Sequence, residues 1–450
     1  MRIMENEAMS IALDDLKEIP VEDKMMFFIS NRKRTPICTF AIVLKENVDK
    51  SILNRALLDT LRVYPQYYYT TVIYDNDLYL VKNEEKVEVY LYTGTSCELG
   101  TAETNHYLFC VRYAEDTIMV TLSHGIGDGQ VSFDFAKTLL YYYLTEKGHS
   151  IDTEGMIRID PADSMNWTPQ HDFERYRDPK ATPFWTCKPR PVFNIREEAW
   201  SKDEFMYSTY RISGSLPELM DIVKRVQASP VPLVSSLISQ AIYRCYDVAK
   251  EEQVVVHVPV DMRKMYQINS RNNFISTVYV PYERRCMDMP IDIQVTIARG
   301  IMDLQMQKEN FDFYISQVSE HFGFLSDKNI SVSDKMAYCN QGIEKSTSDT
   351  FTYFYTYVAA IHLPLQMQDL IKDIYFTTVP QDFPFGISMS TYEDTFSLFC
   401  SQSFKSDSLV RRMVDVFKEY GIDVTLENLG VFQGDYYRAD RQREVCLSFN

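Results

Sequence analysis

A histidine and an aspartate stand four residues apart in the glycine-rich segment Ser123-His124-Gly125-Ile126-Gly127-Asp128-Gly129. An apolar run that predicts a strand precedes it, and a helical pattern follows it. His124 would stand at this turn with little side-chain bulk around it, and its unperturbed pKa of about 6.5 suits a general base. Asp128 would stand at the helix entry, where amide dipoles favour a carboxylate. A turn with a capping Asp128 and an incidental histidine explains the same residues.

Other chemical motifs are missing from the sequence. The segment GIGDG lacks the third glycine of a dinucleotide fingerprint, and no P-loop, GxSxG or HExxH pattern occurs. The nine cysteines form no CxxC pair, which argues against a disulfide framework and a structural zinc site and favours reduced thiols. We therefore predict no metal site, since the remaining histidines also lack ligand spacing: His106, His149, His171, His257, His321 and His362.

Charge and hydropathy narrow the function classes further. The chain has 450 residues with 46 basic and 63 acidic side chains, so its net charge is 46 − 63 = −17. Such a chain is a poor nucleic-acid binder, because that role needs a basic face. The N-terminus lacks the order of a signal peptide, and no segment reaches the roughly 18 to 20 apolar residues of a membrane span. We expect a soluble, cytoplasmic protein.

The composition is rich in large adaptable side chains, with 31 tyrosines, 26 phenylalanines and 20 methionines against 15 glycines. Such side chains suit an interior that encloses a shaped apolar cavity. A tyrosine-rich solid core explains the same composition.

The elements that must position the motif alternate between strands and helices. The first half predicts strands over 38–46, 68–74, 78–81, 106–114 and 117–124, a helix between Asp49 and Pro65, and a helix over 130–147. Residues 151–200 are irregular and rich in Pro, Asp and Arg, which favours a boundary or crossover. The second half predicts strands over 205–213, 253–261, 273–282, 350–359, 374–379, 385–393 and 395–403, and helices over 216–227, 232–248, 291–308 and 407–420. Each half is thus a set of strands with packing helices.

The motif resembles HxxxDG, the signature of the chloramphenicol-acetyltransferase-like superfamily, which includes condensation domains and alcohol-acetyltransferase-like proteins. The condensation form is HHxxxDG, and Ser123 replaces its first histidine, as in stand-alone acyltransferases. Residues 259–274 (PVDMRKMYQINSRNNF) are similar to the family's strand that ends in an arginine followed by Asn-Phe. Further segments resemble family elements over about residues 10–425: LNRALLDTLRVYP (53–65), TYVAAIHLP (356–364) and FGISMSTYEDTFSLFCSQS (385–403). The plant-type DFGWG loop is absent, and residues 382–386 (DFPFG) are only weakly similar to it, so we interpret them as a turn.

The resemblance implies an α/β fold of two similar subdomains, each a mixed sheet with packing helices, that form a V with a central tunnel. We expect an N-terminal subdomain over 1–175 that carries the motif, a crossover over 176–199 and a C-terminal subdomain over 200–450. His124 would be the general base. Asp128 would pair with Arg263 and, with Gly129, support the motif. The tunnel lining would include Ser123, Gly125, Ile126 and Gly127, whose small size would leave room for a bulky acceptor.

An acyltransferase of this type also needs a hydrogen-bond donor about 3 Å from the oxyanion. Relatives use a hydroxyl or amide on a strand near the cleft, so the candidate donors here are Thr356, Tyr357 and Asn273. Each also has an ordinary structural explanation, because strand threonines and loop asparagines often satisfy backbone groups. Phosphates of the donor could meet basic clusters, although solvated charge explains them as well: Arg32-Lys33-Arg34, Lys188 with Arg190, Arg284-Arg285 and Arg411-Arg412.

The predicted function is transfer of an acyl group from an acyl-CoA thioester to a small-molecule alcohol or amine, with no covalent enzyme intermediate and no permanently bound cofactor. One alternative is a stand-alone condensation enzyme whose donor is a phosphopantetheine thioester on an acyl carrier protein. Another is a non-catalytic binding protein on the same scaffold. The tail after Leu429 has no interpretation, because an extra strand and a loosely ordered segment fit it equally.

Overall fold

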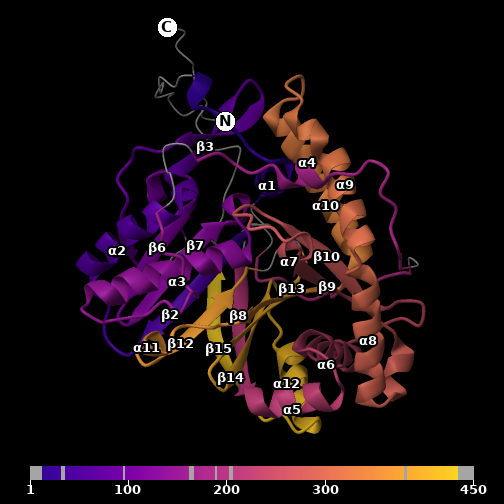
Figure 1. Ribbon diagram of the computed structural model, residues 1–450. Helices are drawn as coiled ribbons and strands as arrows, with labels where there is room; N and C mark the ends of the chain where they lie inside the picture. Colours follow the sequence, from indigo (N-terminus) through magenta and orange to yellow (C-terminus); the bar gives the residue numbers. More distant parts are fainter. Residues whose placement is uncertain are drawn as a thin grey trace.

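A computed structural model of the protein describes residues 13–31, 36–94, 97–161, 167–187, 190–201, 206–379 and 383–433. Figure 1 shows strands and packing helices in both halves of the chain. The N-terminal half has strands β1 (Lys17–Glu18), β2 (Ile37–Leu44), β3 (Tyr69–Tyr74), β4 (Asp77–Lys82), β5 (Val89–Leu91), β6 (Phe109–Ala114) and β7 (Thr117–Ser123), with helices α1 (Val21–Phe28), α2 (Lys50–Val63), α3 (Gly129–Glu146) and α4 (Asp172–Tyr176).

The C-terminal half has more elements of both kinds. Its strands are β8 (Met206–Ser215), β9 (Val254–Asp261), β10 (Ile275–Tyr282), β11 (Tyr353–Ala360), β12 (Ile371–Thr377), β13 (Phe385–Tyr392), β14 (Thr395–Gln402) and β15 (Val424–Gln433). Its helices are α5 (Leu216–Arg225), α6 (Pro230–Cys245), α7 (Arg263–Tyr266), α8 (Ile291–Gln305), α9 (Lys308–Phe322), α10 (Val332–Thr350), α11 (Leu365–Gln368) and α12 (Ser408–Glu419).

The strands form two large mixed sheets and one small one. The first large sheet has the order β12-β2-β7-β6-β5, and the second has the order β10-β9-β11-β13-β14-β8-β15. The small sheet, β1-β4-β3, is built on the hairpin around Asp75 and Asn76, which both have positive φ. The hairpin turn was predicted from these residues, because Asn and Asp tolerate the left-handed region.

The two halves exchange elements. Strand β12 of the C-terminal half pairs antiparallel with β2 at the edge of the first sheet. Helices α9 and α10 also pack against α1 of the N-terminal half, as Figure 1 shows. These contacts join the two halves in space. We therefore keep the division of the chain at 176–199 as a proposal about the order of the subdomains along the sequence.

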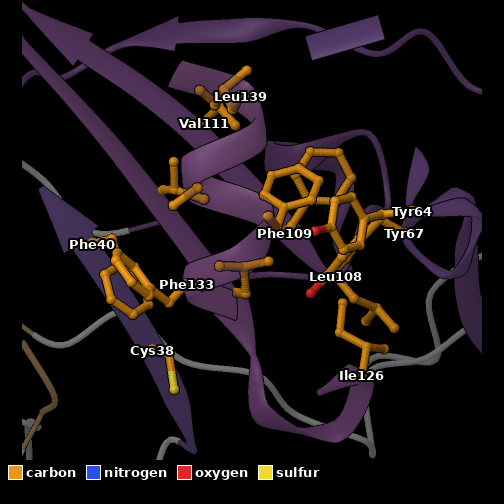
Figure 2. Packing of buried hydrophobic residues seen from close by; sticks show 14 of the residues in the cluster. Cys38, Phe40, Tyr64, Tyr67, Leu108, Phe109, Val111, Ile126, Phe133 and Leu139 are labelled. Carbon is orange, nitrogen blue, oxygen red and sulfur yellow. The ribbon is translucent and has the colours of Figure 1, made fainter. Parts of the chain in front are cut away.

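Each large sheet has its own hydrophobic core. Helices α2 and α3 cover the first sheet, and Figure 2 shows part of that core, where the Phe40 and Phe133 rings lie 5.3 Å apart. Helices α6, α8 and α12 cover the second sheet and bury a separate core between themselves and its strands. The positions of both cores follow from the apolar periodicities of these helices and strands.

The sequence located most of the longer elements to within a few residues, and the short elements β1, β5, α4, α7 and α11 were not predicted. The helix expected over 291–308 ends at Gln305, and α9 begins at Lys308. Helices α1 and α10 were not predicted. Strand β15 extends through Gln433, so the start of the uninterpreted tail is a strand, while 434–450 lie outside the described residues. In the described part of the chain, no helix is both long and apolar enough to span a bilayer.

Candidate active site

His124 directly follows β7, at the start of a short 3-10 turn over His124–Ile126. Both of its backbone polar groups are held by other segments. Its N–H donates to the Pro36 carbonyl at 2.8 Å, and the side-chain amide of Asn273 donates to its carbonyl oxygen at 2.5 Å. The ring is partly buried, and Nδ1 is sealed from solvent without a hydrogen-bond partner. Nε2 is therefore the ring nitrogen that is not sealed.

Burial lowers the pKa of His124 below its usual 6.5, and the charge of Asp128 opposes that shift only in part. Desolvation disfavours the imidazolium, so the neutral ring dominates at neutral pH. A neutral imidazole with one open nitrogen can accept a proton, as a general base requires.

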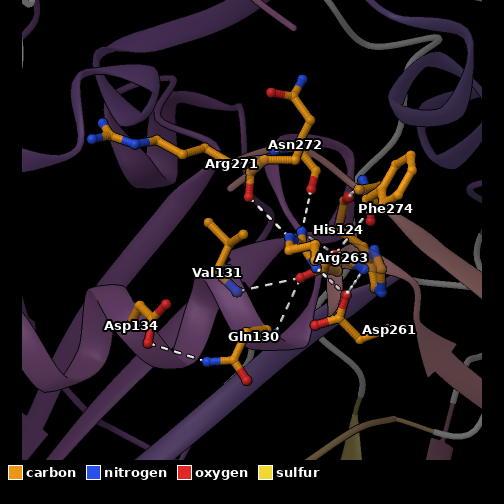
Figure 3. A network of polar contacts seen from close by, with 12 residues as sticks. His124, Gln130, Val131, Asp134, Asp261, Arg263, Arg271, Asn272 and Phe274 are labelled. Carbon is orange, nitrogen blue, oxygen red and sulfur yellow. Dashed lines mark hydrogen bonds and ion pairs between the residues drawn. The ribbon is translucent and has the colours of Figure 1, made fainter. Parts of the chain in front are cut away.

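Asp128 is the N-cap of α3. Its Oδ1 accepts from the backbone N–H groups of Gln130 at 3.2 Å and Val131 at 3.3 Å. Its Oδ2 accepts from the Phe274 N–H at 3.1 Å and from Arg263 at 2.6 Å. Figure 3 shows these contacts converging on the turn. Four donors occupy this carboxylate, so Asp128 holds the shape of the loop.

Arg263 lies at the start of α7, 135 residues from Asp128 in sequence, and the expected ion pair between them is present. The Asp128 side chain is 2% exposed and that of Arg263 is 10% exposed. The guanidinium also donates to the Ser270 carbonyl at 2.9 Å, the Asn272 carbonyl at 2.6 Å and Asp261 at 2.9 Å. A buried pair is stable only when such additional hydrogen bonds satisfy it.

Gly125 and Gly127 are required for reasons other than the open space expected from their size, whereas a Cβ on Gly129 would make only an ordinary van der Waals contact. A Cβ on Gly125 would lie 2.4 Å from the Phe27 ring, so that space is filled by α1. Gly127 has φ 155 and ψ 154, a region that is essentially restricted to glycine. Gly129 opens α3, where a Cβ would meet Val358 of β11 at 3.6 Å.

Two other expected lining residues point into the protein. Ile126 is 5% exposed and belongs to the first core, as Figure 2 shows. Ser123 is 2% exposed, and its hydroxyl accepts from the Gly125 N–H at 3.3 Å. Ile126 therefore contributes packing, and Ser123 supports the turn.

The candidate oxyanion donors on β11 lie on opposite faces of their strand. Tyr357 packs with the second core beside Tyr353 and Tyr355, and its hydroxyl lies 3.4 Å from that of Thr391. Thr356 shares the other face with Val358, which packs on the first core and approaches Gly129. Because strand side chains alternate, Thr356 points to the face of β11 opposite Tyr357 and the second core.

Asn273 is 1% exposed, and its side-chain nitrogen already has two acceptors. It donates to the Asp23 carboxylate at 2.7 Å and to the His124 carbonyl at 2.5 Å. Because both amide hydrogens are used, Asn273 has none left for an oxyanion. Its position in the site comes instead from its contact with His124.

Helix α1 is a part of the site that the sequence did not reveal. Asp23 of α1 accepts from Asn273, and Phe27 fills the space beside Gly125. The α1 sequence VEDKMMFF contains three successive charged residues, which look like solvated surface. A mixed charged and apolar segment that packs entirely inside gives no distinctive periodic signal.

The basic clusters that are described have local partners. Arg190 and Arg285 both pair with Glu283, Arg284 donates to the Val248 carbonyl, and Arg411 and Arg412 pair with Asp407 and Asp415 on α12 or its cap. Arg32, Lys33, Arg34 and Lys188 lie outside the described residues. Solvated and locally paired charge accounts for the described clusters.

Two pockets lie near the site, and the wall of neither includes His124. One of about 520 Å³ lies on the second sheet beside α9 and is lined by aromatic residues that include Trp185, Tyr279 and Tyr314. The other, of about 330 Å³, lies between the large sheets and touches β7 at Met119. Its wall also includes Ile37, the register partner of Ser123.

No protein-family model matches the sequence, and no curated protein does. Solved structures match over nearly the whole chain. Polyketide synthase associated protein 5 from Mycobacterium tuberculosis is 12% identical, with a TM-score of 0.54 over 89% of this chain and 96% of that one. F. sporotrichioides TRI101, solved with coenzyme A and T-2, is 10% identical, with a TM-score of 0.56 over 89% and 98%. The first condensation domain of the CDA synthetase is 11% identical, with a TM-score of 0.56 over 90% and 95%.

This chain has the chloramphenicol-acetyltransferase-like fold. The predicted fold class, an α/β fold of two subdomains with mixed sheets and packing helices, is confirmed by these full-length likenesses.

The buried ion pair predicts a large loss of stability when one partner is removed. Asp128→Ala or Arg263→Ala should lower the free energy of unfolding by about 3–5 kcal/mol, because each leaves a buried charge without its buried partner. The double variant should lose less than the sum of the two single losses. Chemical denaturation measures both effects.

Asp415→Ala is the matched control, because Asp415 pairs with Arg412 on the surface at 3.2 Å. Its loss should cost less than about 1 kcal/mol. An equal effect of Asp128→Ala and Asp415→Ala would contradict the assignment of the buried pair as the lock of the motif.

Proposed function

We propose that this protein transfers an acyl group from acyl-CoA to an alcohol or amine, with His124 as the general base. The observation that carries the proposal is a partly buried imidazole whose backbone is held at both ends and whose pKa is lowered by burial. It stands in an HxxxDG turn closed by the Asp128–Arg263 pair. The fold likeness to acetyltransferases and condensation domains supports the same reaction class.

The reaction needs one base and no covalent enzyme intermediate. Nε2 of His124 accepts the proton of the acceptor hydroxyl or amine as that atom attacks the thioester carbonyl carbon. When the tetrahedral intermediate collapses, the carbon–sulfur bond breaks and the imidazolium returns the proton to the departing thiolate. Holding both substrates at one imidazole supplies the proximity contribution to the rate.

The oxyanion of that intermediate needs a donor on the side of the motif turn. Thr356 fits because it shares its face of β11 with Val358, which approaches Gly129. Tyr357 faces the opposite core, and the Asn273 amide is fully engaged. We therefore assign the donor role to the Thr356 hydroxyl.

We assign access to a tunnel between the two large sheets, with one mouth for the thioester and one for the acceptor. The 330 Å³ pocket supports this assignment, because it lies between the sheets and its wall follows β2 to Ile37, the register partner of Ser123. Two solved relatives of similar fold are complexes with coenzyme A, which supports a CoA thioester as the donor, used as a co-substrate.

The likeness to a condensation domain supports a second candidate for the donor, which is a thioester on an acyl carrier protein. A protein that binds acyl thioesters without turnover is the third alternative. Release of free thiol from a panel of acyl-CoAs with alcohol and amine acceptors separates the three. Turnover only with a loaded carrier protein selects the second, and saturable binding without thiol release selects the third.

The catalytic assignment predicts different outcomes for adjacent residues. His124→Ala should lower kcat by about 10²–10⁴-fold, the usual contribution of a general base. Ser123→Ala removes only the hydrogen bond to the Gly125 N–H and should retain turnover within a few-fold. Thiol release measured on both folded variants tests this, and equal losses would contradict a base at His124.

The two faces of β11 predict a second contrast. Thr356→Val should lower kcat by about 10²–10³-fold, as removal of one oxyanion donor does. Tyr357→Phe removes a hydroxyl on the opposite face and should leave kcat within about two-fold. Steady-state kinetics measures both, and a larger loss in Tyr357→Phe would move the donor to that residue.

The lowered pKa of His124 predicts the pH dependence. Only the neutral imidazole accepts a proton, so kcat/KM should rise with pH through an apparent pKa below 6.5 and level off above it. Activity is thus lost as the pH falls. A pH–rate profile with saturating acyl-CoA checks this, and a limb centred above pH 6.5 would contradict the assignment of the titrating group.

A further inference from the structure

Helix α1 presses against the motif turn at two points. Phe27 fills the space that a Cβ on Gly125 would need, at 2.4 Å from its ring. One turn earlier, the Asp23 carboxyl is 3% exposed and is directed at the loop between α7 and β10. The turn therefore packs against a segment about 100 residues away in sequence.

The Asp23 carboxyl accepts three hydrogen bonds from two consecutive asparagines. Oδ1 accepts from the Asn273 backbone N–H at 3.0 Å and from the Asn273 side-chain amide at 2.7 Å. Oδ2 accepts from the Asn272 side-chain amide at 2.5 Å. The same Asn273 nitrogen donates to the His124 carbonyl at 2.5 Å. A continuous chain of hydrogen bonds thus runs from α1 to the backbone of His124.

This chain fixes the orientation of the Asn273 amide. Its nitrogen lies between Oδ1 of Asp23, which also accepts the Asn273 backbone N–H, and the His124 carbonyl oxygen, so the NH₂ group faces these two acceptors. Its Oδ1 is then left as a buried acceptor without a partner. Nδ1 of His124 is likewise buried without a partner. Burial lowers the pKa of that ring, and the charge of Asp128, the backbone of His124 itself and the Asn273 side chain oppose the shift, in that order.

The two unpaired atoms are chemically complementary. Oδ1 of Asn273 can only accept a hydrogen bond, which an N–H at Nδ1 can donate, and a hydrogen at Nδ1 leaves Nε2 as the basic nitrogen. The hydrogen bond at one ring nitrogen determines which tautomer the other can use. An amide held by Asp23 therefore favours the tautomer that a base at Nε2 requires.

We propose that Asp23 is a positioning residue for His124: through Asn273 it fixes the backbone of His124 and the tautomer of its ring. This rests on the proposed function, in which Nε2 of His124 accepts the acceptor's proton. Asp23 itself touches no reacting atom. Its contribution is to keep one amide rigidly oriented against the histidine.

Asp23 lies in buried surroundings where a carboxyl is destabilising unless it is hydrogen-bonded. Burial raises the pKa of Asp23 to about 7, and the pKa of the neighbouring Glu22 lies well above its usual range, mainly because of burial. In the described residues, the hydrogen-bond partners of Asp23 are the amides of Asn272 and Asn273, and no lysine or arginine pairs with it. An ionisable group is costly in such a place, so its fit to three converging N–H donors accounts for it.

Three variants of α1 distinguish a role of Asp23 through its hydrogen bonds from a role through packing of the helix. Asp23→Ala removes all three acceptor contacts, and kcat should fall by about 10- to 100-fold with KM nearly unchanged, because misplacement of a catalytic group mainly affects the reacting state. Asp23→Asn should stay within about three-fold of the unaltered protein, since its Oδ1 still accepts both Asn273 N–H groups and Asn272 can turn its amide. Glu22→Ala is the matched control.

Glu22 is 2% exposed and lies next to Asp23, but its Oε1 accepts from the Phe173 N–H at 3.3 Å and it has no contact with Asn273. Thermal unfolding of every variant confirms that the compared proteins are folded. If Glu22→Ala lowers kcat as much as Asp23→Ala, the positioning role is wrong. If Asp23→Asn is as inactive as Asp23→Ala, a tether through hydrogen bonds is wrong.

A second readout works without turnover. Imidazole ¹⁵N shifts in a labelled sample report the tautomer of each histidine, and the signal of His124 is assigned by its loss in His124→Ala. Asp23→Ala should increase the Nε2–H share of His124, while Glu22→Ala should leave it unchanged. Unchanged shifts in Asp23→Ala would overturn the inference even if acyl transfer is demonstrated. A shift in a protein without turnover would instead overturn the proposed function and leave the positioning intact.

Discussion

The buried ion pair between Asp128 and Arg263 is the constraint on which the site depends. It joins the start of α3 to the start of α7 across 135 residues, at a contact of 2.6 Å. Two charges taken out of water are favourable only if every remaining donor and acceptor is satisfied. The carboxylate therefore also caps α3, and the guanidinium also binds the loop that leads to β10. Those satisfied groups are what give the motif turn a single shape.

That shape leaves His124 unlike its neighbours. Asp128 and Arg263 have paired polar groups, whereas Nδ1 of the His124 ring is buried without a hydrogen-bond partner. Pro36 holds its N–H, and Asn273 holds its carbonyl. A rigid backbone with an unengaged, neutral imidazole is the arrangement expected of preorganised catalysis, where geometry is set before the substrate arrives. Burial of the polar groups of α1 lowers the stability of the fold, and it accompanies the rigid placement of His124.

The sequence predicted the helices and turns that depend on apolar periodicity and on local capping or turn residues. The α2 helix, with Asp49 as its cap and Pro65 after its end, and the hairpin at Asp75 follow from such signals. The Asp128–Arg263 pair came from a family resemblance, because no local rule relates two residues so far apart. Helix α1 escaped prediction because Glu22, Asp23 and Lys24 are buried, whereas a run of charges ordinarily indicates a solvated face. Lys24 is neutralised by Asp77 at 2.8 Å, a partner that only the tertiary structure supplies.

Strand alternation separates two candidates that the sequence treated alike. Thr356 and Tyr357 are adjacent on β11, a strand that parallel neighbours β9 and β13 flank on both sides. A strand in that position has both faces covered, so each side chain commits to one of two interiors. The tyrosines at 353, 355 and 357 face the second core, which leaves Thr356 on the opposite face, while Val358 packs on the first core beside Gly129. The oxyanion assignment thus follows from the period of two along β11, and a shift of one residue in its register would exchange the roles of the two hydroxyls.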